Sequence, residues 1–441
     1  MTNASGDDAA GGAKRKLVGF DHFMKNRTNP KTDKFGILRF HHLEFWCSDA
    51  TQASHRFTWG LGMPEVARSD LASGNQTYAS HVLQSGETVF AFTAPYFNEP
   101  SVRGDQSNIP FPAFDQKNAH EFVAKHGLAV RALGIRVENA TEAYNISTAN
   151  GARGVTPPSV HTDKVTGKSM TVSEIAYFGD TVLRWVSGDF DGPMLPNYVV
   201  SPRAGMKDGI LSYGINRIDH TVSNVPNLFE AVDYAMKATG MHEFSEFTAE
   251  DVGTVDSGLN SMVLASNNEF VLLPINEPTF GTRRKSQIQT YLEHNNGAGL
   301  QHIALLTDDI FSTMREMRKR SHIGGFEFMP KPSDSYYAKA PNRIGEDSLT
   351  KEQYAELEEL GLLVDRDDQG VLLQVFTKPL GDRPTVFIEI IQRIGCDKDE
   401  HGQKKVQGAG CGGFGKGNFS ELFKSIEEFE KTLEAKGPMY G

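Results

Sequence analysis

Cysteine, basic runs and long apolar runs are scarce in this chain, and each shortage argues against a class of protein. The 441 residues contain only three cysteines, Cys47, Cys396 and Cys411, whose odd number and wide spacing argue against a disulfide framework or a zinc cluster and suit a reducing compartment. No run of about 18 apolar residues is present, so we expect no membrane partner. The net charge of −11 and the lack of basic stretches argue against nucleic acid as a partner.

The N-terminus lacks the apolar segment of a secretory signal. We therefore expect a cytosolic protein, with a plastid location as the alternative. We also expect residues 1–36 to be a disordered or loosely ordered tail.

One pattern is present four times. An apolar strand, an Asp or Asn suited to cap a helix, a helix and further Gly-punctuated strands begin near residues 40, 128, 218 and 300. This pattern predicts an α+β fold of four βαβββ modules paired into two open barrels, over residues 37–195 and 215–441, with a linker at 196–214. Residues 418–435 carry an apolar stripe at helical spacing, which predicts a C-terminal lid helix over the second barrel.

Equivalent positions in these repeats carry metal-binding side chains. Counting back seven residues from each helix cap gives His42, Ala132, His220 and His302. Glu389 lies in a strand-like run of β-branched and aromatic residues, where a carboxylate is costly to bury unless it is paired or binds a metal. Two histidines and one carboxylate form the facial triad of non-haem Fe(II) oxygenases. The sequence therefore predicts an Fe(II) site in the second half.

The first half does not repeat this triad. Matching residues 181–182 with 385–386 places Trp185 where Glu389 lies, so we expect the first half to have lost its metal. His42 and Glu44 also fit the His-x-Glu pattern of cupin metal sites, but a core or surface role is the simpler interpretation. A histidine beside Asp219 can likewise be a hydrogen-bonded core residue. The Gly-x4-Gly-Lys run at 410–416 lacks the Ser or Thr of a P-loop and is interpreted as a flexible loop.

Long stretches of the chain resemble the 4-hydroxyphenylpyruvate dioxygenase family, and its plant branch in particular. The resemblance covers residue 17 onward and is carried by residues 17–20, 39–46, 218–220, 258–261, 274–278, 285–302, 363–374, 376–393 and 410–434. It implies a vicinal-oxygen-chelate fold and an Fe(II) enzyme that converts 4-hydroxyphenylpyruvate and O₂ to homogentisate and CO₂. In cells this reaction serves tyrosine catabolism and, in plants, the supply of plastoquinone and tocopherol precursors.

The resemblance also implies the site residues. His220, His302 and Glu389 would hold the iron. The polar part of the substrate pocket would contain Ser261, Asn276, Gln287, Gln301 and Gln374, with Gln287 and Gln374 also catalytic. The apolar wall would contain Phe376, Phe387, Phe414, Phe419 and Leu422. Strand alternation, however, predicts that Gln301 and His302 point to opposite faces.

Two other functions remain open on the sequence. A 4-hydroxymandelate synthase uses the same substrate and metal but hydroxylates the benzylic carbon, and a non-catalytic protein of the same module class would only bind an aromatic ligand. The intact triad argues against the second. We expect a homodimer.

Overall fold

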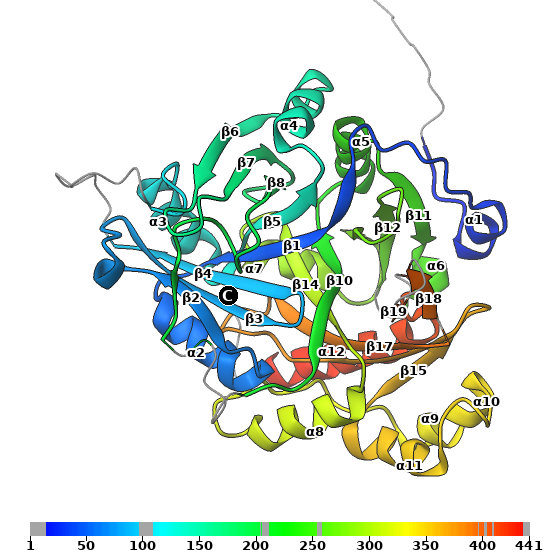
Figure 1. Cartoon of the computed structure of the whole chain (residues 1–441). Coiled ribbons are helices and arrows are strands. Elements are labelled where there is room, and N and C mark those ends of the chain that lie inside the picture. The colour runs from blue at the N-terminus through cyan, green and yellow to red at the C-terminus, as the bar shows by residue number, and fades with distance from the viewer. Residues whose placement is uncertain are drawn as a thin grey trace, which may run out of the picture.

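The structure is a computed structural model of the chain (Figure 1), and it describes residues 15–96, 109–202, 204, 211–253, 258–395, 397–400, 404–407 and 410–434. Two large sheets dominate it, and each is built from two βαβββ modules. In each sheet the first strands of the two modules pair antiparallel at the centre, and each also lies parallel to the last strand of its own module. The predicted α+β fold of four modules is confirmed.

The first sheet has nine strands in the order β6-β7-β8-β5-β1-β4-β3-β2-β9. Its first module comprises β1 (Ile37–Trp46), α2 (Ala50–Leu61), β2 (Glu65–Ser69), β3 (Tyr78–Ser85) and β4 (Thr88–Pro95). Its second module comprises β5 (Ala129–Val137), α4 (Ala140–Ala149), β6 (Gly154–Thr162), β7 (Ser169–Ala176) and β8 (Val182–Gly188). The short strand β9 (Val199–Val200) pairs with β2 at one edge.

The second sheet has eight strands in the order β11-β12-β13-β10-β14-β17-β16-β15. Its first module comprises β10 (Ile215–Asn224), α5 (Leu228–Thr239), β11 (His242–Phe247), β12 (Leu259–Ala265) and β13 (Leu272–Pro278). Its second module comprises β14 (Gly299–Thr307), α8 (Ile310–Arg320), β15 (Leu363–Arg366), β16 (Val371–Phe376) and β17 (Phe387–Ile394).

The remaining elements connect or cover the sheets. Before and within the first sheet lie α1 (Phe20–Asn26), the 3₁₀ turn η1 (Leu71–Ser73) and α3 (Gln116–His126). Within the second half lie α6 (Ala249–Val252), α7 (Gln287–His294), α9 (Asp334–Ala338), α10 (Ala340–Ile344) and α11 (Lys351–Leu360). The chain then forms the hairpin β18 (Asp397–Glu400) and β19 (Lys404–Gln407), the turn η2 (Lys416–Asn418) and the last helix α12 (Phe419–Glu434).

Each module helix begins where the sequence places its cap. The side chains of Asp49, Asn139, Asn227 and Asp309 accept hydrogen bonds from backbone N–H groups in the first turn of α2, α4, α5 and α8. Because the cap follows each first strand directly, the distance from strand to cap is fixed locally. This explains why the seven-residue count finds equivalent strand positions.

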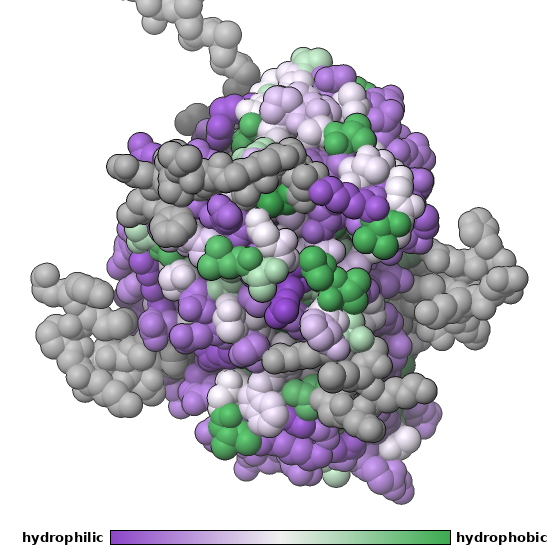
Figure 2. All heavy atoms as spheres, turned by 60° about the vertical axis from the view of Figure 1, so that its left-hand side comes forward, coloured by the Kyte–Doolittle hydropathy of each residue, from purple (hydrophilic) through white to green (hydrophobic). Residues whose placement is uncertain are grey.

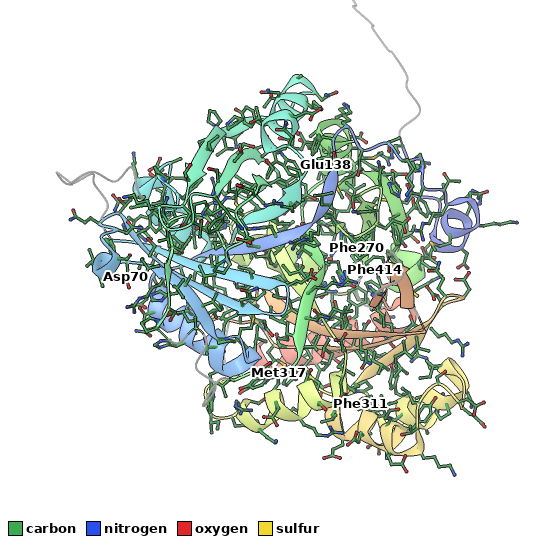
Figure 3. The ribbon with its side chains drawn as sticks, in the orientation of Figure 1. Asp70, Glu138, Phe270, Phe311, Met317 and Phe414 are labelled. Carbon is green, nitrogen blue, oxygen red and sulfur yellow. The ribbon has the colours of Figure 1, made fainter. Side chains whose placement is uncertain are left out.

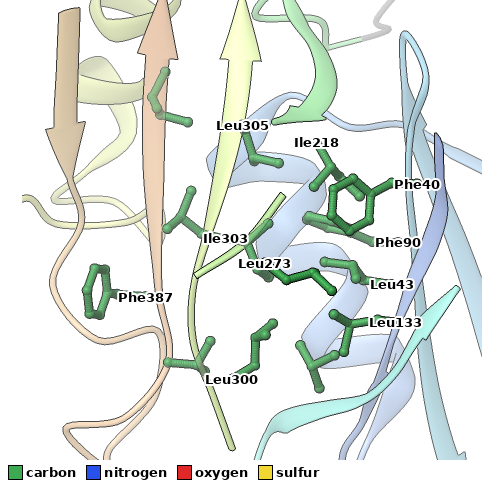
Figure 4. Packing of buried hydrophobic residues seen from close by; sticks show 14 of the residues in the cluster. Phe40, Leu43, Phe90, Leu133, Ile218, Leu273, Leu300, Ile303, Leu305 and Phe387 are labelled. Atoms are coloured by element: carbon green, nitrogen blue, oxygen red, sulfur yellow. The ribbon is translucent and has the colours of Figure 1, made fainter. Parts of the chain in front are cut away.

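A shared apolar layer joins the two halves. Leu43, Leu133, Ile303 and Leu305 belong to one cluster of buried side chains contributed by both sheets. In Figure 4 the strands of the first half lie on one side of this layer and those of the second half on the other. Since alternate strand residues point to opposite faces, the neighbours of these residues, such as His42 and His302, face away from the layer.

The expectation about the N-terminal segment is wrong. Within residues 1–36, those up to 14 lie outside the described part, but the following residues dock on the second sheet rather than forming a loose tail. The backbone N–H groups of Val18 and Gly19 donate to Glu246 Oε1, and the Phe20 and Phe247 rings stack with centroids 5.1 Å apart. A seven-residue helix is marginal alone, so these tertiary contacts, invisible to periodicity, hold it.

The segment at 196–214, which we expect to link the two halves, also contributes β9 to the first sheet. A second correction concerns cysteine, because Cys411 is disulfide-bonded, which the cysteine count did not predict. Cys47 is a free, buried thiol, as expected for a structural cysteine.

The surface is mixed in character. On the face that Figure 2 shows, hydrophobic residues form small separate groups among hydrophilic ones. Among the described residues, no helix combines the length and the apolar character needed to cross a membrane.

Candidate metal centre and substrate pocket

Three strands of the second sheet bring His220, His302 and Glu389 together. His220 lies on β10, His302 on β14 and Glu389 on β17, which are neighbours in the sheet. The Nε2 atoms of both histidines lie 3.3 Å from Glu389 Oε2, and one ligand atom from each residue lies within 4.8 Å of the others. Within the described part of the chain, this is the one cluster of His, Cys, Asp or Glu side chains arranged to hold a metal ion.

These distances fit a metal ion. With metal–ligand bonds of about 2.1 Å at right angles, adjacent ligand atoms lie about 3.0 Å apart. The two separations of 3.3 Å are close to this value. All three side chains are nearly buried, with 4, 9 and 3 % of their residue surfaces exposed. Buried carboxylates and imidazoles of this kind need a charge partner or a metal.

The electrostatics of the trio favour a charged carboxylate. Burial opposes ionisation of Glu389, but hydrogen bonds and attraction from His220 and His302 outweigh it and hold the pKa of Glu389 below its ordinary value. Burial lowers the pKa of His302 and outweighs the opposite effect of Glu389. A neutral imidazole and an ionised carboxylate are the forms that bind metal.

A β-bulge precedes each histidine and gives its ring a partner. In β10, Ile218 and His220 face consecutive residues of β14, which leaves Asp219 as an extra residue. In β14, Gln301 is the extra residue in the same way. The Asp219 carboxylate accepts from His220 Nδ1 at 2.8 Å, and Gln301 Oε1 lies 2.9 Å from His302 Nδ1. Each bulge thus supplies a polar group that orients the ring beside it.

The second bulge corrects the expectation for Gln301. Strict alternation would put Gln301 and His302 on opposite faces, but the inserted residue interrupts the alternation and both side chains line the pocket. Gln301 also lies 3.5 Å from Asn276 Nδ2. An extra residue in a ladder has no local mark in the sequence, since only the pairing of two distant strands defines it.

One pocket contains every residue that the sequence nominates for the site. The trio lies in it with the expected polar side chains Ser261, Asn276, Gln287, Gln301 and Gln374 and the expected apolar side chains Phe376, Phe387, Phe414, Phe419 and Leu422. These residues come from β10, β12, β13, β14, β16 and β17, from the start of α7, from the turn before η2 and from α12. Residues that the sequence did not single out complete the lining: Val222, Phe247, Leu259, Val263, Pro274 and Gly415.

Aromatic rings pack directly on the two histidines. Phe387 stacks on His302 with centroids 4.9 Å apart and Phe376 meets its edge at 6.1 Å. Phe414, labelled in Figure 3, contacts His220 edge to face at 5.2 Å. These rings exclude water from the trio and offer faces to an aromatic ligand.

The C-terminal segment closes the pocket. Phe414, Gly415, Phe419 and Leu422 all line it. Gly415 has φ of +73°, and a Cβ there would lie 2.5 Å from Gln374 Oε1, so glycine allows the chain to pass this close to the glutamine. The C-terminal segment thus forms one wall of the cavity.

In the first sheet, an arginine takes the place of the acid. Gly134 and Ala304 each lie two residues after the equivalent positions Ala132 and His302. Gly134 pairs with Arg184, and Ala304 pairs with Glu389. Arg184 and not Trp185 is therefore the counterpart of Glu389. The expected alignment is wrong by one residue, because the turns that precede the two strands differ in length. Trp185 instead packs in the core, 5.2 Å from the Phe35 ring.

The Arg184 guanidinium occupies a closed polar cluster. It lies 2.6 Å from Glu44 and 2.8 Å from Glu174, and it hydrogen-bonds His42 Nε2 at 3.1 Å. The expected loss of the metal pattern in this half agrees with this arrangement, since the position facing His42 holds a fixed positive charge. Glu44 is therefore ion-paired with Arg184 in the core and His42 is hydrogen-bonded beside it, as the simpler interpretation predicted.

Known proteins resemble the chain over nearly its whole length. The model of the Glyoxalase/Bleomycin resistance protein/Dioxygenase superfamily matches residues 217–340. The 4-hydroxyphenylpyruvate dioxygenase of Plectranthus scutellarioides is 58 % identical over 96 % of this chain and 95 % of its own length. The enzyme of the same name from Arabidopsis thaliana is 57 % identical over 98 % of this chain and 96 % of its own length.

A solved structure shares the fold at low identity. A 4-hydroxymandelate synthase variant from Streptomyces coelicolor superposes with a TM-score of 0.69 at 21 % identity, covering 90 % of this chain and 99 % of that one. With more than half of the residues identical to the plant relatives over nearly the full length of both chains, the chain belongs to the 4-hydroxyphenylpyruvate dioxygenase family.

Proposed function

We propose that the protein is an Fe(II)-dependent dioxygenase that converts 4-hydroxyphenylpyruvate and O₂ to homogentisate and CO₂. The observation that carries the proposal is the convergence of His220, His302 and Glu389 at the base of a pocket lined by aromatic and amide side chains. One oxygen atom of O₂ enters the carboxylate that forms at the keto carbon as CO₂ leaves, and the other enters the ring. The oxidative decarboxylation of the substrate supplies the electrons, so no further reductant is needed. Bound Fe(II) would supply the activation of O₂.

The three strand residues would hold the iron from one side. Neutral imidazoles and a single carboxylate leave positive charge on a divalent ion, which favours an anionic 2-oxo acid as the ligand on the open side. Asp219 and Gln301 would keep the Nδ1 side of each ring occupied, so that Nε2 remains directed at the metal.

The pocket walls would bind the rest of the substrate. Phe376 and Phe414 offer edges and faces to the phenol ring. Gln287 and Gln374, which we propose to be catalytic, would bind and orient polar groups of the substrate, and Ser261, Asn276 and Gln301 would extend this polar surface. Gln374 Oε1 is buried without a hydrogen-bond partner among the described residues, as expected of a group that awaits a ligand.

The C-terminal segment would act as a lid. Phe419 and Leu422 line the pocket with apolar surface, which supports this role. Closure would exclude water while O₂ reacts, and opening would admit substrate and release homogentisate.

Anaerobic reconstitution with Fe(II) tests the proposal. The protein is expected to bind about one iron, to consume O₂ only when 4-hydroxyphenylpyruvate is present, and to release homogentisate that chromatography identifies. A matched control is His42→Gln, at the register equivalent of His220 in the first sheet, which should keep normal iron stoichiometry. Release of 4-hydroxymandelate, or ligand binding without O₂ consumption, would contradict the proposed reaction.

Assembly and location complete the proposal. We infer a homodimer, and sedimentation velocity should show a species of twice 48.6 kDa. A single-chain species would refute the dimer. We also infer a cytosolic location with the plastid as the alternative, and fractionation of the source cells distinguishes the two.

A further inference from the structure

A fully buried arginine lies behind the candidate metal centre. Arg393 follows Glu389 by four residues on β17, so the two side chains share a face of the strand. The Arg393 side chain has no exposed surface. A buried guanidinium is costly unless its donors are satisfied, and this one is satisfied from two directions.

On one side, Arg393 donates hydrogen bonds to the carboxylate that orients His220. Its Nε and Nη2 atoms donate to the two oxygens of Asp219 at 3.0 and 2.8 Å, in the fork geometry of a bidentate pair. Asp219 Oδ2 also accepts from His220 Nδ1 at 2.8 Å. The position of the guanidinium therefore fixes the position of the carboxylate, and through it the His220 ring.

On the other side, Arg393 holds the C-terminal segment. Its Nη1 atom donates to the carbonyl oxygens of Cys411 and Gly413, the latter at 2.8 Å. Gly410, Gly412 and Gly413 have φ of +68, +79 and +75°, a backbone that glycine adopts readily and that shapes this turn. The next residue is Phe414, which packs on His220.

We propose that Arg393 is a positioning residue that couples metal binding at His220 to closure of the segment at 410–434. When the segment closes, its two carbonyls fix the guanidinium and, through Asp219, the ring of His220. A metal held by His220 fixes the same chain of contacts from the other end and so favours the closed segment. The coupling is reciprocal, as any linkage between two binding events must be. This inference rests on the proposed function only in that the trio holds iron.

A second arginine provides a matched control. Arg343 also holds the start of the lid, since its Nη2 donates to the Gly417 carbonyl at 3.0 Å and to Asn418 Oδ1 at 3.2 Å. Within the part of the chain that the structure describes, its polar contacts are with Gly417, Asn418 and Asp365 and include neither Asp219 nor the trio. Loss of Arg343 should loosen the segment without breaking its link to the metal.

Amide hydrogen exchange of the full chain, with and without Fe(II) under anaerobic conditions, measures the coupling directly. In the wild type, saturating Fe(II) should slow exchange within residues 410–419 by roughly 5- to 150-fold. In Arg393→Gln, iron affinity should fall about 10- to 100-fold, and the segment should no longer respond to saturating iron. In Arg343→Gln, the segment should exchange faster in both states but still slow down when iron binds.

Two further variants distinguish a loss of coupling from a folding defect. Arg393→Gln leaves the Asp219 charge buried without its partner; the pair Asp219→Asn with Arg393→Gln removes both charges and should also abolish the response to iron. Arg393→Lys keeps the charge but not the fork, and should recover affinity in part without restoring the response.

The outcomes separate this inference from the proposed function. A wild-type protein that binds no iron overturns both. A wild-type protein that binds iron while exchange of 410–419 stays unchanged overturns the coupling alone, and so does an Arg393→Gln variant with normal iron affinity and a normal exchange response.

Discussion

Replacing Arg184 with methionine is expected to destabilise the first half of the molecule without affecting the metal centre in the second. Arg184 is 1 % exposed and lies between two carboxylates, Glu44 and Glu174, which are 5 and 3 % exposed. Arg184→Met would leave both acids facing each other in the core with no positive charge between them. His42 would also lose the donor to its Nε2.

The magnitude follows from the burial of the pair. Removing one partner of a buried ion pair costs about 3–5 kcal/mol, and the presence of two acids favours the upper end. Since 1 kcal/mol shifts the Tm of a domain of 150–250 residues by roughly 2–4 °C, the melting temperature should fall by roughly 6–20 °C. Neutralising all three groups, with Glu44→Gln and Glu174→Gln added, should recover most of this loss.

Urea unfolding followed by tryptophan fluorescence is a suitable assay. The three tryptophans, Trp46, Trp59 and Trp185, all lie in the first half, so their emission reports on that half. Replacement of the exposed Arg153 by methionine is the control and should change stability by less than about 0.5 kcal/mol. A cost below about 1 kcal/mol for Arg184→Met would refute the reasoning, and so would a loss of iron affinity comparable to that of a ligand variant.

Three further expectations concern the site and the N-terminal segment. Glu389→Gln should fold with a Tm near that of the wild type but bind almost no Fe(II), as measured by metal analysis after gel filtration; normal iron content would count against the trio. Deleting residues 408–441 should leave iron bound at saturation while O₂ consumption becomes slow or uncoupled from product, whereas full coupled activity would argue against a lid. Burial raises the pKa of Asp33 to about 6, against the opposing hydrogen bond from the Asn267 backbone. Its contribution to stability is therefore present below about pH 4 and is lost as pH rises through about 6. Asp33→Asn should consequently raise stability at pH 7–8 by less than about 1 kcal/mol, with no gain near pH 4 by urea titration; an equal effect at both pH values would contradict this.

The local patterns of the chain predicted its modules and ligand positions well. Helix caps such as Asp49 and Asp309 follow their strands directly, so counting from them locates His42 and His302 in the correct register. Matching residues 181–182 with 385–386 failed for Trp185, because the strand that carries Arg184 is reached through a turn of different length. A register error of one residue moves a side chain to the opposite face of the sheet. The error therefore assigned a core tryptophan to the position that a charged arginine occupies.

The resemblance of long sequence blocks supplied the pocket residues, and the fold brought all of them to one cavity. Residues that act through another residue were harder to find. Asp219 and Gln301 gain their positions from bulges, and a bulge exists only where two strands pair. Arg393 has no recognisable motif, and its partners Asp219 and Gly413 are distant from it in sequence or lie beyond the end of its strand.

The sequence by itself determined the four modules, their caps and the three side chains of the candidate centre, because these depend on patterns within short segments. The tertiary structure alone decided that a guanidinium replaces the acid in the first half, that Arg393 contacts both Asp219 and the carbonyls of residues 411 and 413, and that residues 15–36 dock on the second sheet. Each of these depends on strand register and on contacts between residues far apart along the chain, and no local pattern carries that information.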